Sequence, residues 1–293
     1  MPLEVKNVEY TYSPNTPNAS VALKGVDLTI DEGEFVGIIG HTGSGKSTLV
    51  QLMCGLMAPT QGQILIDGVD INAKETAKDL RKKLRLQVGM VFQYPEHQLF
   101  EETVLKDICF GPKNLGFNED EAKSQAKAAM KKVGLPLNLA NESPFDLSGG
   151  QKRRVAIAGV LAMKPKYLIL DEPTAGLDPK GREEILAQVQ KMQKELGITI
   201  ILVSHSMDDV ARFADRIIVM NKGEKYLQGT PREIFAHDEE MFALGLGIPV
   251  VTQILKRLQK EGWAVRTDIV DLAAAKEEIL RVWRLRKGGK NHA

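Results

Sequence analysis

The feature that most constrains this chain is the stretch Gly40–Ser47, which reads GHTGSGKS. It follows an apolar segment, Phe35–Ile39, and precedes the helix-like run Thr48–Met53. Glycines let the backbone turn tightly, so that successive N–H groups form an anion nest, reinforced by the positive end of the helix. The stretch therefore predicts a phosphate-binding loop, in which Lys46 reaches the β- and γ-phosphates of a nucleotide and Ser47 holds Mg²⁺.

The alternative interpretation of this loop is a glycine-rich turn between strand and helix that binds nothing. The lysine, the hydroxyl residue and the strand–loop–helix context together argue against it. The nucleotide-binding residues predicted by the motif are Gly40, His41, Thr42, Gly43, Ser44, Gly45, Lys46, Ser47 and Thr48, with His41 expected only to line the loop.

Composition is that of a globular protein. At 293 residues, one large domain with a small appendage is expected, and 43% hydrophobic residues suffice for a core. The net charge of +1 provides no overall field for nucleic acid or anionic lipid. The two cysteines, Cys54 and Cys109, lie among apolar residues without metal-ligand spacing, so we expect buried thiols in a reducing compartment.

Targeting and membrane-spanning signals are not recognisable in the sequence. The first residues lead directly into a strand pattern, and no apolar run approaches the roughly 18 to 20 residues that span a bilayer. We therefore expect a soluble chain, or one held at a membrane only by partners.

Hydrophobic patterns predict an α/β fold. Apolar and polar residues alternate in Leu3–Tyr12 and Ala22–Ile30, whereas Tyr167–Leu170 and Ile198–Val203 are wholly apolar and are expected to be buried on both faces. Strands and helices alternate, which favours a core with a mainly parallel sheet, an antiparallel β part at the N-terminus and a helical insertion at about 95–163. Helices are expected at Glu119–Val133, Gln151–Met163 and Pro179–Leu196.

Beyond about residue 235 the pattern weakens. We divide the chain into a domain at 1–236 and a C-terminal extension at 237–293. Within the extension we expect a linker at Gly245–Pro249, helices at Val250–Gln259 and Ala273–Leu285, and a short strand at Trp263–Val265.

Two adjacent acids follow the apolar strand that ends at Leu170. Strands that end in acids place them at the edge of a sheet where ligands bind. Asp171 is expected to hold the Mg²⁺ that bridges the phosphates, and Glu172 to polarise a water in line with the γ-phosphate. The alternative is that both acids only end a strand before a turn, but the phosphate loop favours the functional interpretation.

Leu147–Gln151 reads LSGGQ and precedes a helical pattern. Its N–H groups and hydroxyl form a second anion site, although a serine N-cap followed by flexible glycines has the same pattern. Together with the phosphate loop and the two acids, in this order, the string resembles the signature of ATP-binding-cassette (ABC) ATPases. The resemblance covers residues 3 to about 235 and implies a cassette with a RecA-like parallel-sheet core, an N-terminal antiparallel β part and a helical subdomain.

The resemblance implies roles for single residues. Tyr12 matches the aromatic that stacks on adenine, although it could simply pack a strand end. His205 matches the switch histidine, although it could be an ordinary polar loop residue. Two chains of this family pack head to tail, so that the signature of one contacts the γ-phosphate held by the other. The implied sets are Glu172, His205 and Gln93 for catalysis; Ser47, Gln93 and Asp171 for Mg²⁺; Leu147, Ser148, Gly149, Gly150 and Gln151 for the partner's ATP; and Asp178 in a dimer loop.

Phe92–Asn114 includes FQYPEHQLFEETV and resembles the ATPases of energy-coupling-factor importers, which take up vitamins or transition-metal ions. GHTGSG and PEHQLF are most similar to the second of the two A-component paralogues. The resemblance implies ATP hydrolysis coupled to transport at the cytoplasmic face of the cell membrane. It also implies three partners: a second ATPase subunit (the other A component, or a second copy), a transmembrane T component and a substrate-binding S component.

Two further surfaces acquire expected roles from this resemblance. Arginines of the T component are expected to meet acids of this chain, unless these are ordinary helix-start acids; the candidates are Glu96, Glu101, Glu102 and Asp107. The C-terminal extension is expected to add to the dimer contact, the alternative being a small regulatory module.

Non-transport ATPases of the same fold are the alternative function. DNA-repair and chromosome-organising members carry long coiled-coil insertions, and no sustained heptad run is present here. Translation factors join two cassettes, whereas this chain has one. A phosphate-loop kinase would leave Leu147–Gln151 without a role.

Overall fold

The computed structural model describes residues 2–288 and is built around a six-stranded sheet. The strand order is β10-β9-β3-β8-β7-β6, and all neighbours are parallel except the β10–β9 pair. The middle strands are buried along their whole length, as their apolar sequences predict. The strands are β3 (Phe35–Ile39), β6 (Val88–Val91), β7 (Tyr167–Asp171), β8 (Thr199–Val203), β9 (Arg216–Asn221) and β10 (Glu224–Gly229).

Successive residues of these strands enter two different cores, because side chains alternate across a sheet. In β3, Phe35 and Ile39 face a core shared with the helices below, whereas Val36 and Ile38 face a core shared with α1 (Lys46–Met53) and a second sheet. That second sheet is antiparallel, in the order β2-β1-β4-β5, and confirms the expected N-terminal β part. Its strands are β1 (Leu3–Tyr12), β2 (Ser20–Ile30), β4 (Gln61–Ile66) and β5 (Val69–Asp70).

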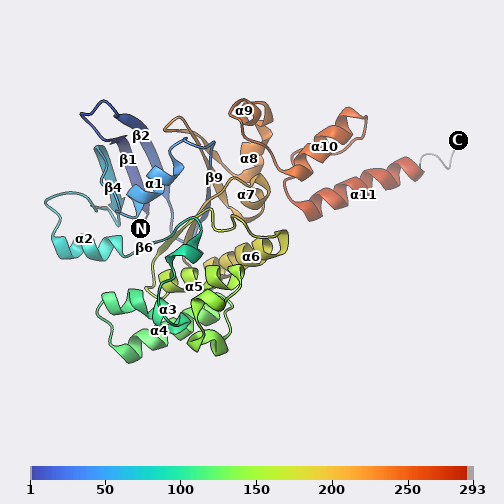
Figure 1. Cartoon of the computed structure of the whole chain (residues 1–293). Coiled ribbons are helices and arrows are strands. Elements are labelled where there is room, and N and C mark those ends of the chain that lie inside the picture. The colour runs from blue at the N-terminus through green and yellow to red at the C-terminus, as the bar shows by residue number, and fades with distance from the viewer. Residues whose placement is uncertain (1, 289–293) are drawn as a thin grey trace.

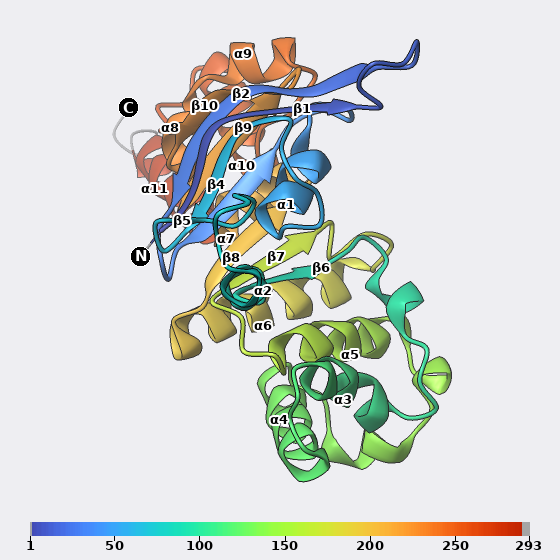
Figure 2. The ribbon, with the colours of Figure 1, turned by 90° about the vertical axis from the view of Figure 1, so that its left-hand side faces the viewer.

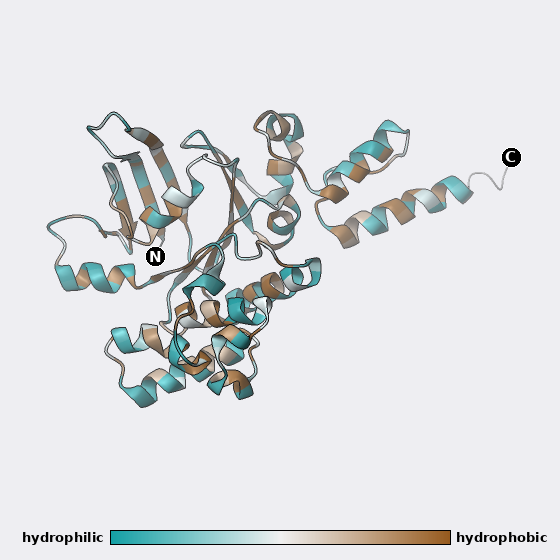
Figure 3. Cartoon of the chain, in the orientation of Figure 1, coloured by the Kyte–Doolittle hydropathy of each residue, from teal (hydrophilic) through white to brown (hydrophobic). Residues whose placement is uncertain are grey.

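A helical layer lies on the far side of the main sheet from β1 and β2 (Figures 1 and 2). Its longest member, α4, begins with a capping box of Asn118 and Glu121 and buries Ala122, Ala126 and Ala129 against its neighbours. Polar residues cover its outer face (Figure 3). The layer comprises α3 (Val104–Asn114), α4 (Glu119–Lys132), α5 (Gly149–Leu161) and the short 3₁₀ turns η1 (Pro95–Gln98), η2 (Leu137–Asn141) and η3 (Pro144–Asp146).

The remaining helices flank the two sheets. The bounds of α6 agree with the sequence prediction, because Pro179 follows the N-cap Asp178 and Gly197 ends the helix in a left-handed conformation (φ 64°). These helices are α2 (Lys78–Arg85), α6 (Pro179–Leu196), α7 (Met207–Phe213), α8 (Pro231–Ala236) and α9 (Asp238–Ala243).

The C-terminal part forms a helical hairpin, α10 (Val250–Lys260) and α11 (Leu272–Gly288), which projects from the body (Figure 1) and has a small core of its own. The expected linker before it is packed rather than open, since Leu246 and Ile248 are buried in the main core. The strand expected at Trp263–Val265 is wrong: the segment is irregular, and Val265 instead packs between the two helices. Residues 289–293 of the expected extension lie outside the described residues.

Cys54 and Cys109 are buried and free, as expected. Among residues 2–288, none of the helices combines the length and the apolar character needed to cross a membrane.

Candidate nucleotide-binding site

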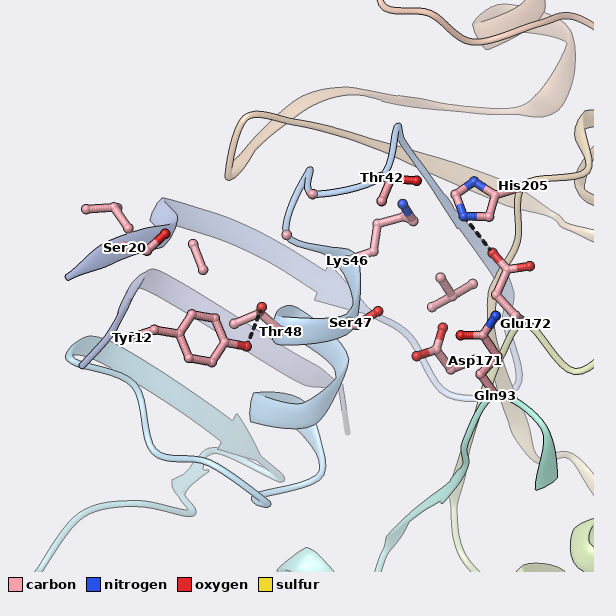
Figure 4. Close-up of a pocket in the computed structure, with 15 residues that line it drawn as sticks. Tyr12, Ser20, Thr42, Lys46, Ser47, Thr48, Gln93, Asp171, Glu172 and His205 are labelled. Carbon is pink, nitrogen blue, oxygen red and sulfur yellow. Dashed lines mark hydrogen bonds and ion pairs between the residues drawn. The ribbon is translucent and has the colours of Figure 1, made fainter. Parts of the chain in front are cut away.

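A cavity of about 480 Å³ opens where the main sheet meets the antiparallel sheet (Figure 4). Three strands of the main sheet lead into it, and within two residues of its end each is followed by a polar residue that lines the cavity. These are Gln93 after β6, Glu172 after β7 and His205 after β8. The other lining residues are Tyr12, Ser20, Val21, Ala22, Thr42, Gly43, Gly45, Lys46, Ser47, Thr48, Asp171 and Val203.

The phosphate loop wraps around the Lys46 side chain. The Lys46 Nζ donates hydrogen bonds to the carbonyl oxygens of Gly40 at 2.7 Å and His41 at 3.0 Å. Burial lowers the pKa of Lys46, and the nearby Glu172 and Asp171 offset part of that decrease. The bend requires glycine, because Gly45 has φ 101° and a Cβ there would lie 2.8 Å from the Ala22 carbonyl oxygen.

Two side chains of the predicted loop point away from the cavity. The His41 ring contacts the Thr42 carbonyl oxygen at 2.7 Å and Asn221 Oδ1 at 3.2 Å. Ser44 is fully buried beneath the loop. The side chains of His41 and Ser44 are therefore directed away from the cavity. Only the backbone groups at these two positions remain available to a ligand.

The two acids lie opposite the loop (Figure 4). The Ser47 hydroxyl donates a hydrogen bond to Asp171, and burial raises the pKa of that carboxyl. Burial, followed by the charge of Asp171, raises the pKa of Glu172 to about 7. Glu172 Oε1 lies 3.1 Å from His205 Nε2 but accepts no well-aligned hydrogen bond from the described part of the chain. A carboxylate with such a pKa and an unused oxygen is suited to act as a general base at neutral pH.

Tyr12 stands at the mouth of the cavity, 40% exposed, and its hydroxyl forms a 3.0 Å hydrogen bond with Thr48 Oγ1. Ser20 pairs with Tyr12 across the hairpin, and with Val21 and Ala22 it lines the same wall. Sequence reasoning missed these three residues. The available signal was the hairpin register, which brings the start of β2 next to the end of β1.

The signature segment lies elsewhere on the surface, at the start of α5. Ser148 and Gln151 form a capping box, with the Ser148 N–H donating to Gln151 Oε1 at 2.9 Å. Nothing in residues 2–288 lies within 4 Å of a Cβ built at Gly149 or Gly150, and neither glycine has a left-handed φ. Since the chain itself does not require glycine there, these positions are suited to close approach by something outside it. None of Leu147–Gln151 lines the cavity.

Comparison with known proteins identifies the family. The ABC transporter family model matches residues 23–175. The energy-coupling factor transporter ATP-binding protein EcfA2 of Caldanaerobacter subterraneus subsp. tengcongensis is 55% identical over 292 residues, covering 99% of this chain and 100% of that protein. This chain belongs to the EcfA2 family of ABC ATPases. The EcfA2 of Clostridium acetobutylicum is likewise 55% identical, over 284 residues that cover 96% of this chain and 98% of that one.

Solved structures support the ABC cassette fold. CbiO1 from Clostridium perfringens, part of the ABC transporter complex CbiONQ, aligns with a TM-score of 0.73 and 43% identity over 89% of this chain and 96% of that one. A dimeric, post-hydrolysis structure of the cassette MJ0796 with ADP and Pi aligns with a TM-score of 0.68 and 34% identity, over 78% and 98%. The family and the fold expected from the sequence are therefore confirmed.

Proposed function

We propose that this chain is the ATP-hydrolysing subunit of an energy-coupling factor importer. The observation that carries the proposal is the full-length similarity to EcfA2 proteins, together with a cavity that holds Lys46, Asp171 and Glu172. The non-transport alternative is not favoured, since these relatives are transporter subunits over the whole length of this chain.

In the proposed reaction, Lys46 exchanges its two carbonyl partners for phosphate oxygens, which offsets their charge. Glu172 then accepts a proton from the attacking water, and His205, 3.1 Å from it, orients the γ-phosphate side of the site. Tyr12 is positioned to stack on the adenine at the mouth.

A Mg²⁺ site fits the residues present. Ser47, Gln93 and Asp171 offer hydroxyl, amide and carboxylate oxygens, the ligand atoms that this ion prefers. Asp171 is 8% exposed and its pKa is raised, so a cation would offset the energetic penalty of its buried charge. Bound there, Mg²⁺ would neutralise charge on the phosphates.

The signature supports a head-to-tail dimer. Ser148, Gly149 and Gly150 lie outside their own chain's cavity, with open space around both glycines. In the proposed dimer they cap the γ-phosphate held by a second ATPase subunit, the other A component, and Asp178 lies in the contact between the two. Hydrolysis removes that bridge and the dimer opens.

Contacts within the chain reduce the number of acids that we propose to meet the T component. Asp107 accepts backbone hydrogen bonds from Phe100 and Glu101, and Glu102 pairs with Lys106. Glu96 pairs with Arg153 inside the chain. Among the four expected acids, this leaves Glu101 as the carboxylate we assign to a T-component arginine.

The extension at 237–293 offers an apolar face for the second ATPase subunit. Exposed Val250, Ile254 and Leu272 adjoin a shallow apolar groove between α10 and α11. We therefore assign dimerisation to this segment, and attachment to the cytoplasmic face of the membrane to the T component and, through it, to the S component.

Purification from membranes tests the function. Tagged chain should co-purify with a second ATPase, a transmembrane T component and a substrate-binding protein, and the complex should hydrolyse ATP. Recovery of the chain free of membrane partners, with ATPase activity stimulated by DNA, would instead support the non-transport alternative.

A further inference from the structure

Arg153, in α5, carries a charged side chain that is 1% exposed. Its Nη2 donates to both carboxylate oxygens of Glu96, at 3.1 and 2.9 Å, and its Nη1 donates to the carbonyl oxygen of Ala175 at 3.0 Å. One guanidinium therefore joins two segments that are remote in sequence: η1, and the turn that follows β7.

Both segments lead directly to the nucleotide cavity. Glu96 lies in η1, shortly after the cavity residue Gln93, and Tyr94 between them has a left-handed conformation (φ 54°) that turns the chain sharply. Ala175 donates its N–H to the carbonyl oxygen of Glu172 at 3.1 Å, which closes the turn that begins at Glu172 (φ 50°). Arg153 thus holds, through Ala175, the turn that carries the proposed general base.

Stability alone does not explain this residue. Arg153 Nε is buried and has no hydrogen-bond partner within residues 2–288. A buried ion pair contributes little to stability, because desolvation offsets its attraction, and an apolar side chain could fill the space. What an apolar side chain could not do is donate in two directions at once, as the planar fork of arginine does.

We propose that Arg153 is a positioning residue for ATP hydrolysis, which fixes the turn of Glu172 relative to the segment that follows Gln93. A displacement of η1 is passed through Glu96 and Arg153 to Ala175, and so to the position of the Glu172 carboxylate. The inference rests on the proposed ATP hydrolysis and adds to it a route by which the surface around η1 reaches the catalytic carboxylate.

The test measures steady-state ATP hydrolysis by the full chain in its assembled complex, for Arg153→Lys, Glu96→Gln and the double variant. Lysine reaches one of the two partners but not both. We therefore expect Arg153→Lys to lower kcat about tenfold with KM for ATP within about twofold, because a displaced catalytic group slows chemistry without weakening binding. The double variant should be no slower than Arg153→Lys, because the two residues act as one unit.

Arg154→Lys is the matched control. Arg154 is next in the same helix, but it donates to the Val133 carbonyl oxygen at 2.7 Å and touches neither segment, so we expect wild-type kcat. Glu96→Gln changes a side chain that is 22% exposed, and it decides the test if Arg153→Lys does not fold.

If the wild-type complex is active, three results would overturn this inference while leaving the proposed function intact. The first is an equal kcat for Arg153→Lys and Arg154→Lys, and the second is an effect of Arg153→Lys on KM instead of kcat. The third is additive effects of Arg153→Lys and Glu96→Gln in the double variant. A wild-type complex that hydrolyses no ATP would overturn the proposed function, and this inference with it.

Discussion

Lys46, Asp171 and Glu172 bring one positive and two negative charges into the same poorly solvated cavity. Burial favours the neutral form of each side chain. It therefore lowers the pKa of Lys46 and raises the pKa of both Asp171 and Glu172. Burial, followed by the charge of Asp171, outweighs the opposing effects of Lys46, the His205 backbone and Arg182, and this leaves Glu172 with a pKa of about 7. The site therefore suits a ligand that supplies further charge and a base that works near neutral pH.

Glu172→Gln should abolish turnover while sparing nucleotide binding. The amide keeps the shape of the side chain but cannot accept a proton, so we expect ATP hydrolysis to fall at least 100-fold, a typical loss for a missing general base. Phosphate release and ATP binding to the purified chain measure the two effects. Glu184→Gln, on an exposed side chain of α6, serves as control. Turnover near the wild-type rate would show that Glu172 is not the catalytic carboxylate.

Lys46→Ala should weaken ATP binding, the step that precedes hydrolysis. It removes the ammonium that faces the phosphates, so we expect ATP affinity to fall at least tenfold, since charge-assisted hydrogen bonds to phosphate are strong. Calorimetric titration with ATP measures the loss. The exposed Lys180→Ala is the matched control and should bind normally. Undiminished affinity in Lys46→Ala would contradict the phosphate-loop assignment.

Elements of the core follow from the sequence more directly than those outside it. β7 is a continuous apolar run because both faces are buried, and α6 carries its own start and stop signals in Pro179 and Gly197. α2 has little apolar sequence, and its helical form was not predicted; one of its residues, Leu84, is buried. Trp263–Val265 has a strand-like composition, but without a neighbouring strand it forms no ladder.

The residues of the site also differ in how far the sequence alone predicts their roles. Motif spacing predicted most of the loop and strand-end residues that line the cavity, because these motifs are local in sequence, but Gly40, His41 and Ser44 do not line it. It could not distinguish Arg153 from Arg154, which are equivalent in sequence but lie in different surroundings once α5 packs. Nor could it show that Glu96 is paired within the chain.

In the C-terminal hairpin, Glu278 joins α11 to the segment before it. It accepts hydrogen bonds from the Arg266 N–H at 2.9 Å and from Arg281 Nη2 at 2.7 Å, and these contacts lower its pKa from the usual 4.5 to about 2. Because the pKa of Glu278 is lower in the folded state, its stabilisation of the folded hairpin is complete above pH 4.5 and is lost as the pH falls toward 2.

Glu278→Gln should therefore loosen α10 and α11 at pH 7, with faster amide hydrogen exchange across both helices. Exchange in the wild type should accelerate as the pH falls below about 4.5, after correction for the intrinsic rate, while the variant changes little. Glu277→Gln is the matched control on the same helix. Equal protection of wild type and Glu278→Gln at pH 7 would contradict this role.

At the scale of the whole molecule, the two proposed anion sites of the chain lie apart. The cavity is lined from the two sheets and the phosphate loop, whereas Ser148 caps α5 in the helical layer. Within residues 2–288, Gly149 and Gly150 have no neighbour that would require glycine at these positions. In the proposed head-to-tail dimer, a second subunit therefore brings a signature of its own to this cavity and completes the ATP site.

This arrangement predicts that a variant in the signature lowers ATP hydrolysis by the assembled complex without weakening ATP binding by its own chain. Ser148→Arg places a bulky cation where the partner's nucleotide would approach. We expect the isolated chain to bind ATP within about twofold of wild type, whereas the assembled complex loses at least tenfold in turnover, because one closing contact is missing. Ser143→Arg, at the neighbouring serine cap of η3, is the control for charge and bulk. If Ser148→Arg instead weakened ATP binding by the isolated chain, the signature would act within its own subunit, and the cavity would not depend on a partner. If turnover of the complex were unchanged, the partner's nucleotide would not meet this segment at all.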